Sequence, residues 1–133
     1  MSSIFESRVS VYRNAMSTDA VNTALQTFLN SKKHRAEIER LRSETDKPTR
    51  DNLKKHLPAA TISGTFARRA VSGIDTYNRL VCLDFDGKDN PGWTPDDMKS
   101  VLCGFEETAY CGLSAGGQGV FAIIPTTNPE PAQ

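Results

Sequence analysis

One short segment, Leu80-Val-Cys-Leu-Asp-Phe-Asp86, constrains the fold of this chain more than any other. Five of its seven residues are apolar, and Gly87 follows it, which predicts a short strand and not a helix. Successive side chains of a strand point to opposite faces, so Asp84 and Asp86 are expected to share one side. The residues expected on the other side, toward a core, are Val81, Leu83 and Phe85.

The segments before this strand predict mainly helices. Ser17 or Thr18 can cap a helix, because their side-chain oxygens accept backbone N–H groups. The apolar stripe expected on that helix comprises Val21, Ala24, Leu25, Phe28 and Leu29. A first strand over residues 4–12 is expected to precede it. An exposed helix over residues 31–43 and a short helix from Thr49 to Leu57 are expected to follow.

The pattern after Pro58 predicts strands and one helix. Ala60–Phe66 is expected to be a strand with a bulge or close backbone approach at its internal glycine, and residues 71–78 a polar turn. Thr94 followed by Pro95 is a strong helix start, and the expected core face of this helix is Met98, Val101, Leu102 and Phe105. Further strands are expected over residues 108–113 and 120–124.

This order of elements favours an α+β fold with a largely antiparallel sheet. The length of 133 residues fits a single domain over residues 1–125. Within it we expect a basic helical half with a strand (1–70) and a half that carries the paired aspartates (71–125). Residues 126–133 are expected to be a tail or linker.

The net charge is zero, but the charges are distributed unevenly. Residues 31–69 carry eleven Lys and Arg against five Asp and Glu, and residues 70–133 carry three against nine. Such a split is typical of a protein that binds a polyanion beside an acidic site. Two solvated surfaces that compensate each other explain the same numbers.

The chain has no apolar run long enough to cross a membrane and no signal-peptide core at its start. Its three cysteines, Cys82, Cys103 and Cys111, are odd in number and lack CxxC spacing. We therefore expect reduced, mostly buried thiols in a cytoplasmic protein without membrane partners.

The paired aspartates are the main candidates for chemistry. The Cα atoms of Asp84 and Asp86 are about 6.5 Å apart along an ideal strand. Carboxylates at this separation can hold a hard divalent cation such as Mg²⁺ or Mn²⁺. In the alternative interpretation Asp86 only starts a turn, and Asp84 caps or pairs locally.

The segment Ser114-Ala-Gly-Gly-Gln-Gly119 is glycine-rich and lies between two expected strands. Its backbone N–H groups can form an anion-binding nest, or it can be an ordinary hairpin turn. The candidate nucleotide-binding residues are Ser114, Gly116, Gly117, Gln118 and Gly119.

Basic side chains are the candidates for nucleic-acid contacts, since lysine and arginine neutralise phosphates. The residues singled out are Arg68, Arg69, Lys54 and Lys55, within a larger set that includes Lys32, Lys33, Arg35, Arg40, Arg42 and Arg50. His34 and His56 are expected at the surface. No Ser/His/Asp arrangement supports nucleophilic hydrolysis.

Five segments, in this order, resemble the primase-like N-terminal domain of virulence-associated protein E (VirE) type proteins, which is similar to the archaeo-eukaryotic primase and primase-polymerase superfamily. They are Ala36–Arg42, Leu53–Pro58, Ile62–Phe66, Leu80–Asp86 and Ser114–Gly119. The resemblance implies an RRM-like half with a strand-helix-strand-strand core packed on an N-terminal α/β half. A complete RRM-like unit has a further helix and strand after Ile124, so an incomplete primase-like fold is expected.

The resemblance also implies a function. Asp84 and Asp86 would be catalytic and would bind Mg²⁺ or Mn²⁺, with a nucleoside triphosphate on the glycine-rich segment and a single-stranded DNA template on the basic residues. A helicase-like ATPase, fused or associated, would be the partner in replication of mobile elements.

Two alternatives to nucleotidyl transfer remain open from the sequence. Residues 112–124 contain no histidine, Val120 and Phe121 stand where relatives often have lysine, and no third acid follows on a strand. These departures are consistent with a non-catalytic nucleic-acid-binding module. The segment Leu83–Gly87 also resembles the first motif of haloacid-dehalogenase-like phosphatases, with Asp84 as nucleophile, although Lys88 replaces the expected threonine.

Overall fold

The computed structural model describes residues 3–67 and 73–127 of the chain. Within these residues the protein is α+β, and every strand pair is antiparallel. The strands form three small sheets, with the orders β2-β1-β3, β4-β5 and β6-β8-β7. Arg68, Arg69 and residues 128–133 of the expected tail lie outside the described residues.

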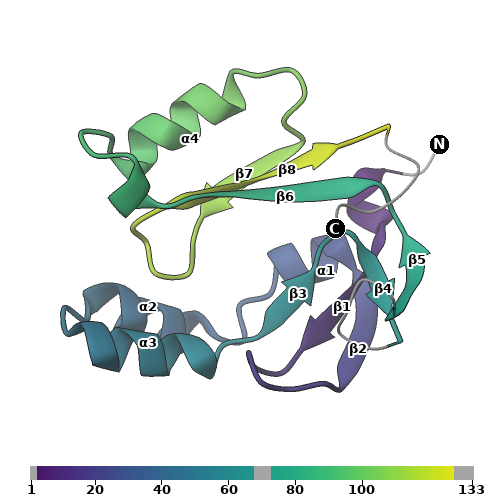
Figure 1. Cartoon of the computed structure of the whole chain (residues 1–133), viewed down its shortest axis with the longest axis horizontal. Helices are drawn as coiled ribbons and strands as arrows, with labels where there is room; N and C mark the ends of the chain where they lie inside the picture. The colour runs from purple at the N-terminus through teal and green to yellow at the C-terminus, as the bar shows by residue number, and fades with distance from the viewer. Residues whose placement is uncertain (1–2, 68–72, 128–133) are drawn as a thin grey trace.

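The N-terminal half consists of a three-stranded sheet and a pair of basic helices (Figure 1). After the short 3-10 helix η1 (Ile4–Glu6), the sheet contains β1 (Arg8–Tyr12), β2 (Ala20–Ala24) and β3 (Ala59–Thr61). Between β2 and β3 the chain forms α1 (Leu25–Leu29), α2 (Arg35–Ser43) and α3 (Lys47–Lys55).

The C-terminal half is built on β6 (Leu80–Phe85), β7 (Tyr110–Leu113) and β8 (Val120–Pro125). Helix α4 (Pro95–Cys103) covers one face of this sheet over β7 and β8, and β6 is an edge strand (Figure 1). A short 3-10 helix, η3 (Gly87–Asp89), follows β6. The small sheet of β4 (Gly64–Phe66) and β5 (Ile74–Tyr77) connects the two halves along the chain.

A core between the two halves holds them together. Its fully buried members are Val9 on β1, Leu25 on α1, Leu80 on β6 and Ile123 on β8. Removing such side chains from water stabilises the fold by roughly 2 kcal/mol each. On the other face of the C-terminal sheet, α4 packs against β7 and β8; Met98 of α4 and Val120 and Ala122 of β8 are buried.

Three predicted elements agree closely with the structure. The strand 80–86 is β6, the basic helix 31–43 contains α2, and the helix that begins at Thr94 is α4. The Thr94 hydroxyl accepts a hydrogen bond from the Asp97 N–H at 3.1 Å, as expected of a cap. The strands predicted over 108–113 and 120–124 contain β7 and nearly all of β8.

The helix predicted to begin after Ser17 is wrong over residues 20–24, which form β2 instead. Pairing along the whole of β1, from Arg8↔Ala24 to Tyr12↔Ala20, outweighs the helical spacing of the apolar residues. Val21 is 71% exposed, so the stripe does not form one buried face. Only α1 remains of the predicted helix, and the first predicted strand begins at Arg8 because residues 4–6 form η1.

Other boundaries also differ from the expectations. The single strand expected over 60–66 is two strands, β3 and β4, in different sheets, and the polar turn expected over 71–78 contains β5. The third helix begins at Lys47, two residues before the expected cap, because the Asp46 side chain accepts the Thr49 N–H at 3.2 Å. The Thr76 backbone approaches Gly64 closely, as expected for the internal glycine, and a register irregularity follows between Thr65 and Phe66.

Several side chains expected in the core are exposed. Val101 and Phe105 are 47% and 54% exposed. Met98 is the one buried residue of α4. Leu83 is 40% exposed because α4 lies over β7 and β8 and leaves edge strand β6 partly uncovered. The thiols of Cys82 and Cys103 are likewise on exposed residues, and Cys111 is half-buried, contrary to the expected burial.

Candidate functional site

The aspartate pair lies where edge strand β6 ends. Asp84 pairs across the ladder with Phe121 of β8 and is exposed, and no ion pair or hydrogen bond holds its carboxylate within the described part of the chain. Asp86 comes one residue after the strand and is also exposed. The two acids therefore reach solvent at the same end of the sheet.

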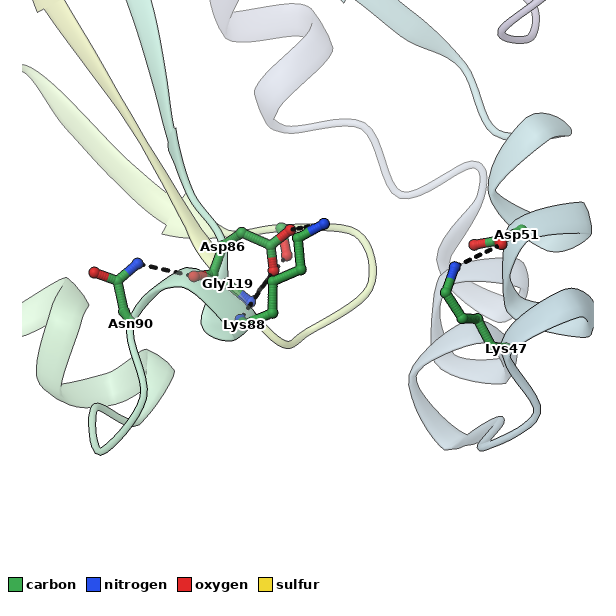
Figure 2. Close-up of polar contacts among 7 residues, drawn as sticks. Lys47, Asp51, Asp86, Lys88, Asn90 and Gly119 are labelled. Atoms are coloured by element: carbon green, nitrogen blue, oxygen red, sulfur yellow. Dashed lines mark hydrogen bonds and ion pairs between the residues drawn. The ribbon is translucent and has the colours of Figure 1, made fainter.

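Asp86 is tied to the loop that follows it (Figure 2). One carboxylate oxygen accepts the Lys88 N–H at 3.2 Å and caps η3, and the other lies 4.0 Å from the Lys88 ammonium. Asn90 donates its side-chain N–H to the Asp86 backbone carbonyl at 2.8 Å. The expectation that Asp86 starts a turn is confirmed, and no arginine of the described residues pairs with its carboxylate.

The glycine-rich loop, residues 114–119, lies directly beside this end of β6. A Cβ atom at position 119 would come within 2.5 Å of the Phe85 carbonyl oxygen and 3.3 Å of the Asp86 Cα. Gly117 has a φ of +75°, a backbone conformation that favours glycine. The loop is a tight hairpin turn, since the Gly117 N–H donates to the Ser114 carbonyl at 2.9 Å.

Two arginines of the helical pair bind the same loop through its carbonyl groups. Arg42 donates to the Ser114 and Ala115 carbonyls at 3.1 and 3.3 Å, and Arg50 donates to the Gly116 carbonyl at 2.9 Å. Arg50 is only 7% exposed and also donates to the Leu41 and Glu44 carbonyls, each at 2.8 Å. Both arginines, expected to hold phosphates, instead fasten the loop to α2 and α3.

Lys54 of α3 lies beside the loop. A Cβ atom at position 116 would be 3.6 Å from the Lys54 ammonium. Lys54 and Lys55 are exposed and form no ion pair with any described residue, whereas Lys47 on the same helix pairs with Asp51 at 3.1 Å (Figure 2). This ion pair also lowers the pKa of Asp51.

The Cys82 thiol shares the Asp84 side of β6. Although the residue is exposed at the sheet edge, surrounding atoms shield its sulfur, and this desolvation together with the Asp84 charge raises the thiol pKa to about 11. Burial, with a contribution from Cys103, raises the pKa of Cys111 as well. Both shifts lower the thiolate fraction further, at a physiological pH where the ordinary thiol pKa of 9.0 already leaves the thiol mostly protonated.

The structure therefore brings together the candidate residues of three separate segments. Asp84 and Asp86, the loop 114–119, and Lys54 surround one end of the C-terminal sheet. The sequence did not reveal the Arg50–Gly116 bond, which joins residues 66 positions apart. His34 is half-buried at the start of α2, and His56 is exposed, with its Nδ1 2.8 Å from the Asn52 carbonyl.

The chemistry open to this site is limited by its ligands. The described residues contain no group of three or more histidine, cysteine, aspartate or glutamate side chains that could hold a metal ion. Two exposed carboxylates can still coordinate Mg²⁺ or Mn²⁺, since such ions often bind one or two carboxylates together with water and substrate phosphates. No described helix is long and apolar enough to span a bilayer.

The fold and site define an α+β domain with an acidic strand end, a glycine-rich hairpin and a basic helical pair. Residues 52–133, more than half of the chain, match the family model described as "BT4734-like, N-terminal domain". The chain therefore belongs to this family. No curated protein and no solved structure matches the chain.

Proposed function

We propose that this chain is a primase-like DNA-binding module that holds single-stranded DNA on the basic surface of α3 beside the acidic end of β6. One observation carries the proposal: Lys54, which forms no ion pair with a described residue, lies next to the glycine-rich hairpin, and the hairpin lies next to the paired aspartates. The VirE and primase resemblance supports the same function. The RRM-like organisation of the C-terminal half and a helicase-like ATPase as the chain's partner are part of this proposal.

The lysines would supply the affinity for DNA. Lys54 and Lys55 are exposed and form no ion pair with a described carboxylate, although after Lys47 both also help to lower the pKa of Asp51. Their charges are therefore available to phosphates. The exposed Ala115 and Gln118 add backbone N–H groups that have no protein acceptor among the described residues. An anion beside the hairpin would thus meet lysine ammonium groups and free N–H donors together.

The first experiment measures binding of a fluorescent single-stranded oligonucleotide to the chain and to the double variant Lys54→Gln/Lys55→Gln. We expect the variant to lose about two phosphate contacts and with them about 1.4 of the slope of log affinity against log salt. Lys47→Gln is the matched control, because Asp51 already neutralises Lys47 on the same helix. Equal affinity and slope in the double variant and the wild type would contradict the assignment.

Metal-dependent nucleotidyl transfer is the second candidate function. The adjacency of Asp84 and Asp86 to the hairpin favours it, because a bound Mg²⁺ or Mn²⁺ would neutralise phosphate charge there. In this reaction a 3′-hydroxyl would attack the α-phosphate of a nucleoside triphosphate, forming a phosphodiester and releasing pyrophosphate. Nothing in the described site favours the phosphatase alternative in the same way.

An incorporation assay with labelled nucleotides tests this second function. Asp84→Asn is expected to reduce incorporation to background, since one of only two nearby carboxylates is lost. Asp75→Asn, at an exposed position on β5 in another sheet, is expected to retain full incorporation. Incorporation at the same rate in Asp84→Asn and wild type would eliminate transfer at this site and leave the binding module.

A further inference from the structure

A large cavity lies on one face of the C-terminal sheet, toward edge strand β7. Phe121 lines it, and Asp84, the ladder partner of Phe121, is on the same face of the sheet. The volume of the cavity is about 1170 Å³, and it opens between β7 with β8 on one side and β1, α1 and α2 on the other. Pockets for single small molecules usually measure about 300–1000 Å³. The cavity therefore has room for part of an extended chain.

Two aromatic rings form part of the cavity wall. Tyr110 of β7 and Phe121 of β8 both line it, with ring centroids 5.8 Å apart and planes inclined by 31°. Gly112 lies opposite Phe121 in the ladder, and a Cβ there would come within 3.0 Å of the Phe121 ring and 3.3 Å of the Tyr110 ring. Because glycine adds no side chain, this wall stays flat and apolar.

The charges that line the cavity are mostly positive. Asp19 is its one acidic lining residue among the described residues. The basic lining residues are Arg13, Lys33 and Lys99, together with Arg42, which already donates to the hairpin carbonyls; His34 also lines the cavity. An occupant complementary to both wall and charges has flat apolar groups joined by anionic ones, which is the chemistry of single-stranded nucleic acid.

We propose that this cavity binds an unpaired base of single-stranded DNA, stacked on the Phe121 and Tyr110 rings. Flanking phosphates would contact the basic residues around the cavity. A base inside a duplex is already stacked and paired, so the cavity selects single strands. This inference rests on the proposed DNA-binding function and adds to it the group that is recognised.

The test compares two oligonucleotides of about ten nucleotides, a length within the usual range of single-strand sites. One is oligothymidine, and the other is the same backbone with abasic sugars. The wild-type chain is expected to bind the abasic strand about tenfold more weakly, because a stacked base is lost while the phosphates remain. This comparison requires no change to the protein and so no change to its folding.

A protein variant then assigns the effect to the cavity. Phe121→Leu is expected to bind oligothymidine about tenfold more weakly and the abasic strand as well as wild type. Phe105→Leu is the matched control, since Phe105 is 54% exposed and does not line the cavity. A thermal melt by circular dichroism verifies that both variants fold.

The outcomes separate the two proposals. Equal affinity of the wild type for both strands would overturn base binding and leave the DNA-binding function intact. Absence of binding to either strand would overturn both. Displacement of oligothymidine by a glutamate-rich peptide of equal charge, at equal concentration, would assign the cavity to an acidic peptide strand and also overturn the inference.

Discussion

At the scale of single residues, the period-2 alternation of a strand places Cys82 and Asp84 on one side of β6. The ladder agrees, since their partners on β8 are Ile123 and Phe121. This neighbourhood makes the Cys82 thiol sensitive to the Asp84 carboxylate, which opposes a second negative charge nearby.

The expected consequence is slow alkylation of Cys82. Because desolvation and Asp84 raise its pKa from 9.0 to about 11, the reactive thiolate is scarce at pH 8 and increases as the pH approaches about 11. Asp84→Asn removes the like charge and is expected to speed alkylation at pH 8. Mass spectrometry of iodoacetamide-treated protein measures both rates, and identical rates would show that the two groups do not interact.

The raised pKa of Cys82 also determines whether the free energy of unfolding rises or falls with pH. The thiol contributes stability below its unfolded pKa of about 9, and this contribution is lost as the pH rises through its folded pKa of about 11. An alkaline titration of unfolding is expected to show the decrease in that window.

The role of Asp86 was only half predictable. An aspartate before Gly87 is typical of a turn, and the cap on η3 agrees with that alternative. The close approach of Asp86 to Gly119 involves residues far apart in sequence, so no local pattern indicates it.

At the scale of elements, local sequence patterns predict secondary structure correctly where a helix has a strong N-cap. They predict it wrongly where pairing with a distant strand determines the conformation. Thr94 fixes the start of α4, whereas residues 20–24 have helical spacing and still form β2. Pairing with β1 supplies backbone hydrogen bonds along five residue pairs, information that the segment itself does not contain. The same reasoning applies to β5, whose pairing with β4 was not foreseen.

Arg50 joins three elements and gives a prediction at this scale. Arg50→Met would leave the Leu41, Glu44 and Gly116 carbonyls without their donor, and we expect it to lower the free energy of unfolding by about 3 kcal/mol. Urea denaturation measures this change.

Arg35→Met provides the control for Arg50→Met. Arg35 is exposed, and its one ion pair within residues 3–67 and 73–127 is with Glu39 four residues along α2, so its loss is expected to change stability by less than about 0.5 kcal/mol. A similar unfolding midpoint in both variants would mean that Arg50 does not fasten the hairpin to the helices.

At the scale of the whole molecule, composition and element order predict the α+β class and the antiparallel pairing, and the structure confirms both. They do not predict three separate sheets, because sheet membership depends on long-range contacts. The basic half and the acidic half are not two independent surfaces. The Arg42 and Arg50 bonds hold the hairpin against α2 and α3, so that Lys54 lies on one side of the hairpin and the acidic end of β6 on another.

The central claim is that this arrangement binds the backbone of single-stranded DNA. The most direct measurement is the dissociation constant of the chain for a labelled single strand, by fluorescence anisotropy, at about 50 and about 200 mM salt with a chelator present. With about three phosphates neutralised, we expect affinity to fall about twentyfold between the two salt concentrations, without any need for metal. An affinity that stays the same at both salt concentrations would contradict the claim.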